Sequence, residues 1–216
     1  MTWRRLALAA ALVGALAACS DDADEPAPTT TTTATTTTTA VADDAALEAR
    51  LVTVDDLPAG FAPDADVNDT VTAFCAGQDA AAGLQASGRA IVGYSREPAG
   101  ASVIHLVFRF EPGDAAAFVT AAEELLTSCS DVPDATGLAF TYEPVSAHVA
   151  TTLESTDASA SRYGVSVGSG NLTVNIGVFQ RGEEAHLIAV LGLDEPRAAL
   201  DELAVTAFGA AVSRSR

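Results

Sequence analysis

The chain has 216 residues, in which 11 basic residues, all of them arginine, stand against 29 acidic ones, for a formal net charge of −18. That length suits one domain of ordinary size together with additional segments. A nucleic-acid phosphate backbone requires a basic surface, so the charge excludes a nucleic-acid-binding protein, and it excludes charge-driven binding to anionic lipid as well.

The N-terminus has the pattern of an export signal. Arg4 and Arg5 precede an uncharged apolar run at residues 6–18, which is too short for the roughly 20 residues that cross a bilayer and is typical of a signal peptide. The run ends in Leu-Ala-Ala-Cys at residues 16–19 and resembles the lipobox of bacterial lipoproteins. The resemblance implies cleavage before Cys19 and a diacylglyceryl anchor, with palmitate as an acyl chain, on its sulfur. The alternative is an ordinary secretory signal with a nearby cysteine.

Residues 19–42 are predicted to form a disordered tether. The segment begins with clustered acidic residues and continues into two runs of five threonines, at residues 29–33 and 35–39. No apolar face is available to offset the entropy of ordering such a chain. A flexible segment of this length spans roughly 25–30 Å, which holds a domain clear of a membrane surface.

A folded domain is predicted over residues 43–216, and its first half contains two helices and two strands. Asp43 and Asp44 cap a short helix, and Thr53 and Asp56 have capping-box spacing. Proline and glycine turns separate the later elements. The elements expected are a helix at residues 43–51, strands at 90–97 and 101–110, and a helix at 114–128.

The second half of this domain contains further strands and a terminal helix. Alternating apolar residues predict strands that form a meander turned by glycines, and Pro196 begins a helix that ends near Arg214. The fold class expected is α+β, with one antiparallel sheet, helices packed on one of its faces and one disulfide. The strands expected are residues 138–142, 162–167, 171–180 and 185–193.

The cysteines support an exported protein. With Cys19 lipidated, Cys75 and Cys129 remain as an even pair, which in an oxidising compartment predicts a structural disulfide worth roughly 4 kcal/mol by loop closure. The alternative, a reactive thiol or a metal pair, requires a nearby histidine or a Cys-X-X-Cys spacing, and the sequence has neither.

Short motifs of the domain resemble a known family. Asp-Leu-Pro-Ala-Gly-Phe at residues 56–61, Phe-Cys-Ala-Gly at 74–77 and a helix ending in Cys129 are similar in order to the PknH-like extracellular sensor domains. Such domains occur as free actinobacterial lipoproteins and attached to transmembrane serine/threonine kinases. The resemblance implies sensing outside the cell and a ligand-sized cleft over the sheet. The kinase-attached members carry more disulfides than the single one available here, and no residue-level site transfers.

The sequence patterns that could indicate catalysis or metal binding are incomplete. Residues 164–168 match Gly-X-Ser-X-Gly, but a nucleophile elbow needs a strand-to-helix turn, whereas valines flank this serine in an alternating strand. No histidine follows Asp194 to complete a triad. The three histidines, His105, His148 and His186, lack the short spacing of a zinc site. We therefore expect no enzyme, no metal and no cofactor.

One set of polar residues is a candidate for ligand binding. In the strand at residues 101–110, His105 and Arg109 face away from Ile104 and Phe108, and the meander adds Arg162, Asn175 and Thr173 to that side. If helices cover the other face, these side chains are free to orient an anionic ligand. The alternative is that carboxylates of this acidic chain neutralise the arginines.

The sequence thus predicts a lipid-anchored, extracytoplasmic sensor or ligand-binding lipoprotein at the cell membrane, without catalysis. The alternatives are a carrier of lipid or glycolipid in the cell envelope, and a protein-interaction module of the cell wall. The expected partners are the membrane, through the lipid on Cys19, and a small ligand or envelope protein; nucleic acid is excluded.

Overall fold

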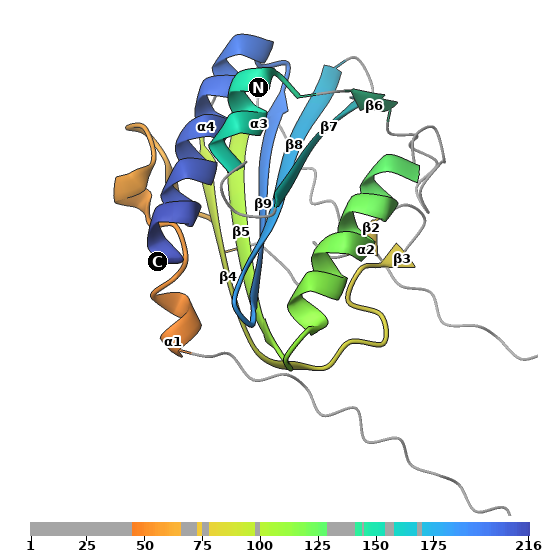
Figure 1. Cartoon of the computed structure of the whole chain (residues 1–216). Coiled ribbons are helices and arrows are strands. Elements are labelled where there is room, and N and C mark those ends of the chain that lie inside the picture. The colour runs from red at the N-terminus through yellow and green to blue at the C-terminus, as the bar shows by residue number, and fades with distance from the viewer. Residues whose placement is uncertain are drawn as a thin grey trace, which may run out of the picture. The chain divides into compact units, whose positions relative to one another are not determined.

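An antiparallel sheet of seven strands, in the order β1-β4-β5-β9-β8-β7-β6, forms the centre of the protein (Figure 1). The computed structural model describes residues 45–65, 73–74, 78–97, 100–128, 141–143, 145–153, 158–167 and 170–216. All of them belong to one compact unit, Thr39–Arg216. The predicted signal peptide, the predicted tether, Cys19 and the predicted Cys75–Cys129 disulfide lie outside the described residues.

Two groups of strands that are local in sequence build this sheet. A hairpin of β4 and β5 pairs with the meander of β7, β8 and β9 because β5 runs antiparallel to β9, from Ala101 opposite Gly192 to Arg109 opposite Glu184. The predicted antiparallel α+β class is confirmed. The strands are β1 (Ala62–Pro63), β4 (Ala86–Arg96), β5 (Ala101–Phe110), β6 (Thr141–Glu143), β7 (Ala158–Val167), β8 (Gly170–Arg181) and β9 (Glu184–Leu193), and a separate hairpin pairs β2 (Ala73–Phe74) with β3 (Gln78–Asp79).

Alternation along the strands gives the sheet two faces, each with its own core. The face named here the α2 face carries the even-numbered residues of β5, such as Leu106 and Phe108, and it packs on α2 (Asp114–Ser128). The rings of Phe108, Phe110 and Phe118 lie 5.5–5.6 Å apart at the centre of this contact.

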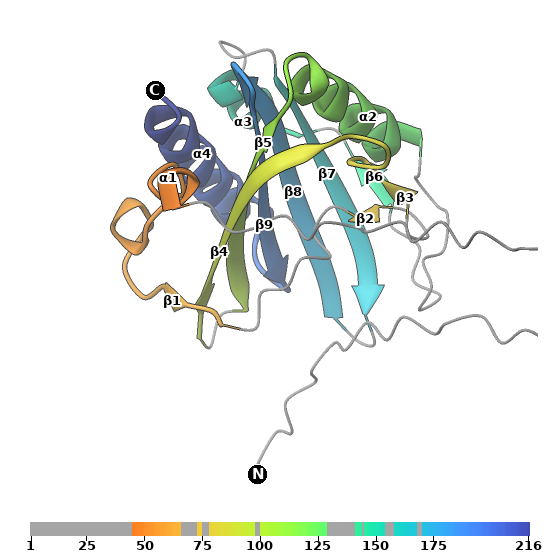
Figure 2. The same ribbon diagram turned by 90° about the horizontal axis from the view of Figure 1, so that it is seen from below.

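The opposite face, named here the α4 face, is covered by α4 (Arg197–Arg214), α3 (Ala147–Leu153) and an N-terminal strap, residues 45–61. The strap contains α1 (Ala45–Glu48) and the 3-10 turn η1 (Val54–Asp56). In Figure 2 the strands run between α4 and α2. The prediction that helices pack on one face of the sheet is therefore wrong.

The physical reason for helices on both faces is that both faces are apolar. Beside His105 and Arg109, the α4 face carries Val103 and Val107 of β5 and, on β9, Ile188 and Val190. Burial of these apolar side chains away from water is favourable, so helices pack on this face as well. The prediction of an open polar face gave too much weight to His105 and Arg109 and too little to the apolar residues beside them.

Glycines let the helices approach the α4 face closely. A Cβ atom on Gly177 of β8 would lie 2.8 Å from Leu153 Cδ1, and one on Gly192 of β9 would lie 2.5 Å from Leu200 Cδ2. Both contacts are shorter than real Cβ contacts. The missing side chains at these positions thus set how near α3 and α4 lie to the sheet.

The observed elements agree with the predicted ones most closely in the centre of the chain. The strand at residues 101–110 and the helix at 114–128 have the predicted bounds, whereas β4 begins four residues before the predicted start at residue 90. Helix α3 was not predicted. Among the described residues, no helix has the length and apolarity needed to span a membrane.

Candidate functional site

The polar residues predicted to bind a ligand lie on the α4 face, and all of them but Arg109, whose side chain is 33% exposed, and Thr173 are buried there. His105 and Asn175 are 0% exposed, and Arg162 is 4% exposed. The expectation that this face is open is therefore wrong. Ligand binding by these residues stays a prediction.

Arg162 and Asn175 form a buried polar link between the sheet and α4. They are cross-strand neighbours on β7 and β8, and the Nε of Arg162 donates to Oδ1 of Asn175 over 2.8 Å. A second guanidinium nitrogen of Arg162 donates to the carboxylate of Asp201 on α4. A carboxylate of this acidic chain thus neutralises Arg162, as the alternative interpretation expected.

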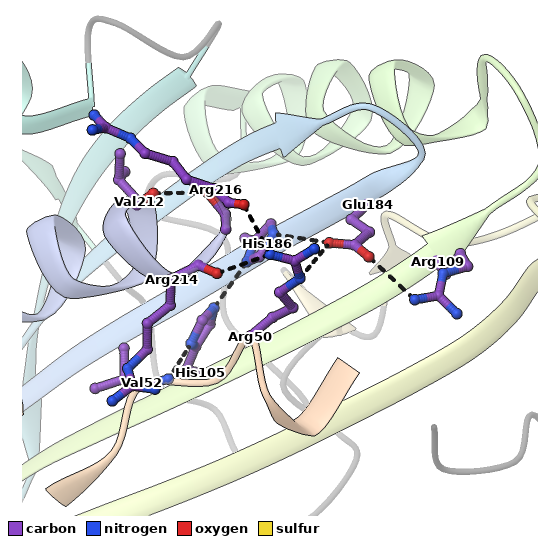
Figure 3. Close-up of polar contacts among 10 residues, drawn as sticks. Arg50, Val52, His105, Arg109, Glu184, His186, Val212, Arg214 and Arg216 are labelled. Atoms are coloured by element: carbon purple, nitrogen blue, oxygen red, sulfur yellow. Dashed lines mark hydrogen bonds and ion pairs between the residues drawn. The ribbon is translucent and has the colours of Figure 1, made fainter. Parts of the chain in front are cut away.

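His105 joins the strap to β9 through both of its ring nitrogens (Figure 3). The backbone N–H of Val52 donates to Nδ1 of His105 over 3.0 Å, and Nε2 of His105 lies 3.2 Å from Nδ1 of His186. Because Nδ1 of His105 accepts a hydrogen bond, the proton of its neutral ring is on Nε2. That proton is donated to His186, and the remaining proton of a neutral His186 is therefore on its own Nε2.

His186 is a neutral imidazole held between two rings. It stacks on Phe179 at 4.4 Å, with 6° between the ring planes, and on His105 at 5.4 Å. Burial, followed by the charges of Arg50 and Arg181, lowers the pKa of His186 to about 3. Burial, followed by His186 and Arg214, holds the pKa of His105 well below its usual value of 6.5. Both rings are uncharged at neutral pH.

The Nε2–H group of His186 has no hydrogen-bond partner among the described residues. Its nearest carboxylate oxygen is Oε2 of Glu184, 4.0 Å away. A buried donor without a partner has lost its hydrogen bonds to water and has gained none within the protein. This costs free energy, and such donors are therefore uncommon in folded proteins. This atom faces a group of charged side chains at the hairpin end of β8 and β9.

Glu184 is at the centre of that charged group (Figure 3). Its Oε1 accepts from Nη2 of Arg109 over 3.2 Å, and its Oε2 lies 3.8 Å from Nε of Arg50. Arg50 also donates from Nη1 to the backbone oxygens of Arg214 and Arg216, each over 3.2 Å. One guanidinium of the strap thus connects β9 to the end of α4.

A third arginine lies beside the same carboxylate. Arg181 of β8 is opposite Glu184 of β9 in the sheet register, and its Nε is buried without a hydrogen-bond partner among the described residues. Arg181 is two residues from Phe179, which is opposite His186 in the same register, so Arg181 and His186 lie on the same face of the sheet. Arg50, Arg109 and Arg181, with Glu184 and His186, are named here the arginine cluster.

The strap is fixed by further polar contacts beside this cluster. Tyr94 donates from Oη to the carbonyl of Val52 over 3.1 Å, so both backbone polar groups of Val52 bind buried side chains. Asp56 Oδ2 accepts from Thr53 N–H over 2.7 Å, in the predicted capping-box position, and from Arg214 Nε over 2.5 Å. Burial raises the pKa of Asp56, but the hydrogen bonds from Arg214 and Thr53 outweigh it, and the net pKa is lowered.

The α2 face is less completely covered at its other end. Away from Phe108, Phe110 and Phe118, large aliphatic side chains of this face are only partly buried, and Leu193 is 45% exposed. Neighbouring strands bring these side chains together in the sheet register. This half-buried aliphatic patch consists of Ile104, Leu172, Ile176, Leu191 and Leu193.

Neither a metal site nor a nucleophile elbow is found in the part of the chain that the structure describes. No group of three or more His, Cys, Asp or Glu side chains there is placed to hold a metal ion. Gly164 to Val167, which begin the Gly-X-Ser-X-Gly match, lie inside strand β7. This agrees with the strand that the flanking valines predict.

Sequence reasoning found Arg109 but missed its neighbours Arg50, Arg181, Glu184 and His186. The hairpin turn at residues 181–182 was predicted, and it places Arg181 opposite Glu184. Side chains two residues apart on a strand lie on the same face, so the spacing of Glu184 and His186 was a further signal in the sequence. Arg50 had none, because its contact with Glu184 joins segments more than 130 residues apart.

Comparison with known proteins gives a fold likeness. No protein-family model and no curated protein sequence matches the chain. The chain is similar to a solved structure titled the crystal structure of the extracellular domain of PknH from Mycobacterium tuberculosis, with a TM-score of 0.52 and 12% sequence identity over 77% of this chain and 94% of that one. A sequence identity of 12% shows similarity of fold alone. The similarity extends over nearly the whole length of the PknH extracellular domain.

Proposed function

We propose that the protein is a lipid-anchored, extracytoplasmic sensor or ligand-binding lipoprotein that performs no catalysis. The observation that carries the proposal is the similarity of fold to the extracellular domain of PknH. It agrees in direction with the Leu-Ala-Ala-Cys motif at residues 16–19, because both indicate a domain exported from the cytoplasm. The lipid on Cys19 and the threonine-rich tether would hold the domain near the membrane.

The contacts of the histidines support a role without catalysis. A histidine that acts as a general base must reach a proton of a nucleophile or substrate. His105 and His186 instead bind each other, and His105 also binds the backbone of Val52. Both rings are 0% exposed. Their hydrogen bonds hold the strap, β5 and β9 together.

A second candidate, a carrier of lipid or glycolipid, is favoured by the half-buried aliphatic patch on the α2 face. Such a patch is the kind of surface on which an acyl chain or another apolar group can be buried. The size and polarity of a bound molecule distinguish the two functions.

The first experiment is mass spectrometry of the protein purified in mild detergent from the membranes of its native host. We expect the native spectrum to contain an adduct that denaturation removes. A small polar adduct supports the sensor, and a molecule with long acyl chains supports the carrier. A protein without any adduct contradicts both and favours the protein-interaction alternative.

The same sample tests the anchor and the disulfide. The denatured mass should contain a diacylglyceryl group, and it should be two hydrogens below the dithiol value if Cys75 and Cys129 are bonded. As a matched control, Cys19→Ser should move the protein from the membrane fraction to the soluble fraction. A Cys19→Ser variant that stays in the membrane fraction contradicts the lipid anchor.

A further inference from the structure

We propose that the arginine cluster is a binding site for a small oxyanion of the phosphate class, with Arg181 and His186 as its unoccupied donors. This inference rests on the proposed function and names the chemistry of a ligand that such a sensor would take. The site lies on the α4 face at the hairpin end of β8 and β9, next to the strap.

The first argument is charge. The chain as a whole is strongly acidic, yet Arg50 and Arg109 both pair with Glu184, and Arg181 is opposite Glu184 in the sheet register. Three guanidinium groups gathered beside one side-chain carboxylate suit an oxyanion. Guanidinium groups also suit phosphate because they present paired N–H donors.

The second argument is the pair of donors without partners. Nε of Arg181 and Nε2 of His186 are both buried, and neither has a hydrogen-bond acceptor among the described residues. The proton on Nε2 of His186 follows from the chain of hydrogen bonds that begins at Val52 N–H. An oxyanion in the cluster would accept from both donors and remove the cost of leaving them unpaired.

The third argument is access. His186 is fully buried, but the side chains of Arg50 and Arg109 are 37% and 33% exposed. The cluster thus has a buried floor and an edge in contact with solvent. Glu184 occupies its centre and competes with an incoming anion for Arg50 and Arg109, whereas Nε of Arg181 and Nε2 of His186 have no acceptor among the described residues.

The test is a titration of the full-length protein, in nonionic detergent at neutral pH, with sodium phosphate at constant ionic strength. Imidazole nitrogen signals are followed by 15N NMR, because the chain has only three histidines and His148→Gln assigns one of them. We expect a saturable shift of the His186 signals. Sodium acetate should act more weakly, and sodium chloride should have no saturable effect.

Three variants separate a site from a general charge effect. Arg181→Gln removes a donor and should weaken phosphate binding about tenfold, the loss expected for one charge-assisted hydrogen bond. Arg197→Gln is the matched control, since Arg197 is 62% exposed and pairs with Glu143 elsewhere, and it should bind as the wild type does. Glu184→Gln removes the competing carboxylate and should tighten binding about tenfold, a gain that misfolding cannot imitate.

Vesicles that contain phosphatidylglycerol, tested against phosphatidylcholine vesicles, identify the source of the anion. A shift with phosphatidylglycerol as well as with free phosphate assigns the site to a lipid headgroup, and a shift with free phosphate alone assigns it to a soluble ligand. The proposal is overturned if phosphate gives no saturable shift, or if Arg181→Gln and Glu184→Gln bind phosphate as the wild type does. That failure is separate from failure of the proposed function, which is an empty protein from the native host.

Discussion

On the α2 face a single helix covers the strands, and three phenylalanine rings fill the contact between them. The α4 face is covered by α3, α4 and the strap, which comes from the other end of the described chain. The α2 face is buried with apolar side chains. The α4 face also buries His105, Arg162, Asn175 and His186. Two faces of one sheet thus depend on different kinds of interaction.

The two faces also differ in how far apart in the sequence their contacting residues lie. On the α2 face, α2 follows directly after β5, so its packing partners are close in sequence. On the α4 face, hydrogen bonds join Val52 to His105 and Arg162 to Asp201, across 53 and 39 residues. Removing one member of such a pair leaves the other buried without a partner. The α4 face therefore adds long-range polar pairs to its apolar core, whereas the α2 face depends on the packing of apolar side chains.

The largest effect is expected at the centre of the α2 face. Phe118→Ala removes a fully buried ring that contacts Phe108 and Phe110, and it should lower the free energy of unfolding by about 3–5 kcal/mol. Urea denaturation measures this loss. Glu124→Ala, at an exposed position of the same helix, is the control and should change stability by less than about 0.5 kcal/mol. Similar losses in the two variants would contradict the assignment of the α2 core.

The next effect compares two arginine–carboxylate pairs in the same molecule. Arg162→Met leaves Asp201 and Asn175 without their buried partner and should cost about 3 kcal/mol. Arg197→Gln breaks an ion pair whose arginine is 62% exposed and should cost less than about 1 kcal/mol. Equal losses in urea denaturation would show that the α4 face does not depend on its buried polar pair.

These two faces also explain what the sequence could predict. Strand β5 and helix α2 have the predicted bounds because their patterns are long and local. The cover of the α4 face could not be predicted, since it depends on a strap and a C-terminal helix that meet only in the folded chain. Arg109 was found from strand alternation, but its partner Glu184 belongs to a strand whose pairing with β5 has no local signal.

Acid should weaken the α4 face through its two histidines. The folded-state pKa of His186 is about 3 and that of His105 is well below 6.5, so below pH 6.5 the unfolded chain binds protons that the folded chain does not. Stability is therefore fully present above pH 6.5 and is lost as the pH falls below it, by about 1.4 kcal/mol per pH unit for each histidine. Urea denaturation at several pH values from 6.5 to 5 measures the slope.

Two substitutions assign this slope. His186→Phe keeps a ring stacked on Phe179 but removes one of the two titrating groups, and it should reduce the slope by about half. His148→Gln, at an exposed position of α3, should keep the wild-type slope. The same pH dependence in His186→Phe as in the wild type would mean that the acid sensitivity comes from other groups.

The smallest effect is expected at one hydroxyl group that contacts the strap. Tyr94→Phe removes the hydrogen bond to the carbonyl of Val52 and should cost about 1 kcal/mol. Amide hydrogen exchange locates this loss, and the Val52 amide should exchange about fivefold faster while amides of α2 around Phe118 are unchanged. Equal acceleration at both places would mean that the strap opens only when the whole domain unfolds. A change confined to the strap would instead show that the strap opens as a separate unit, without unfolding of the α2 face.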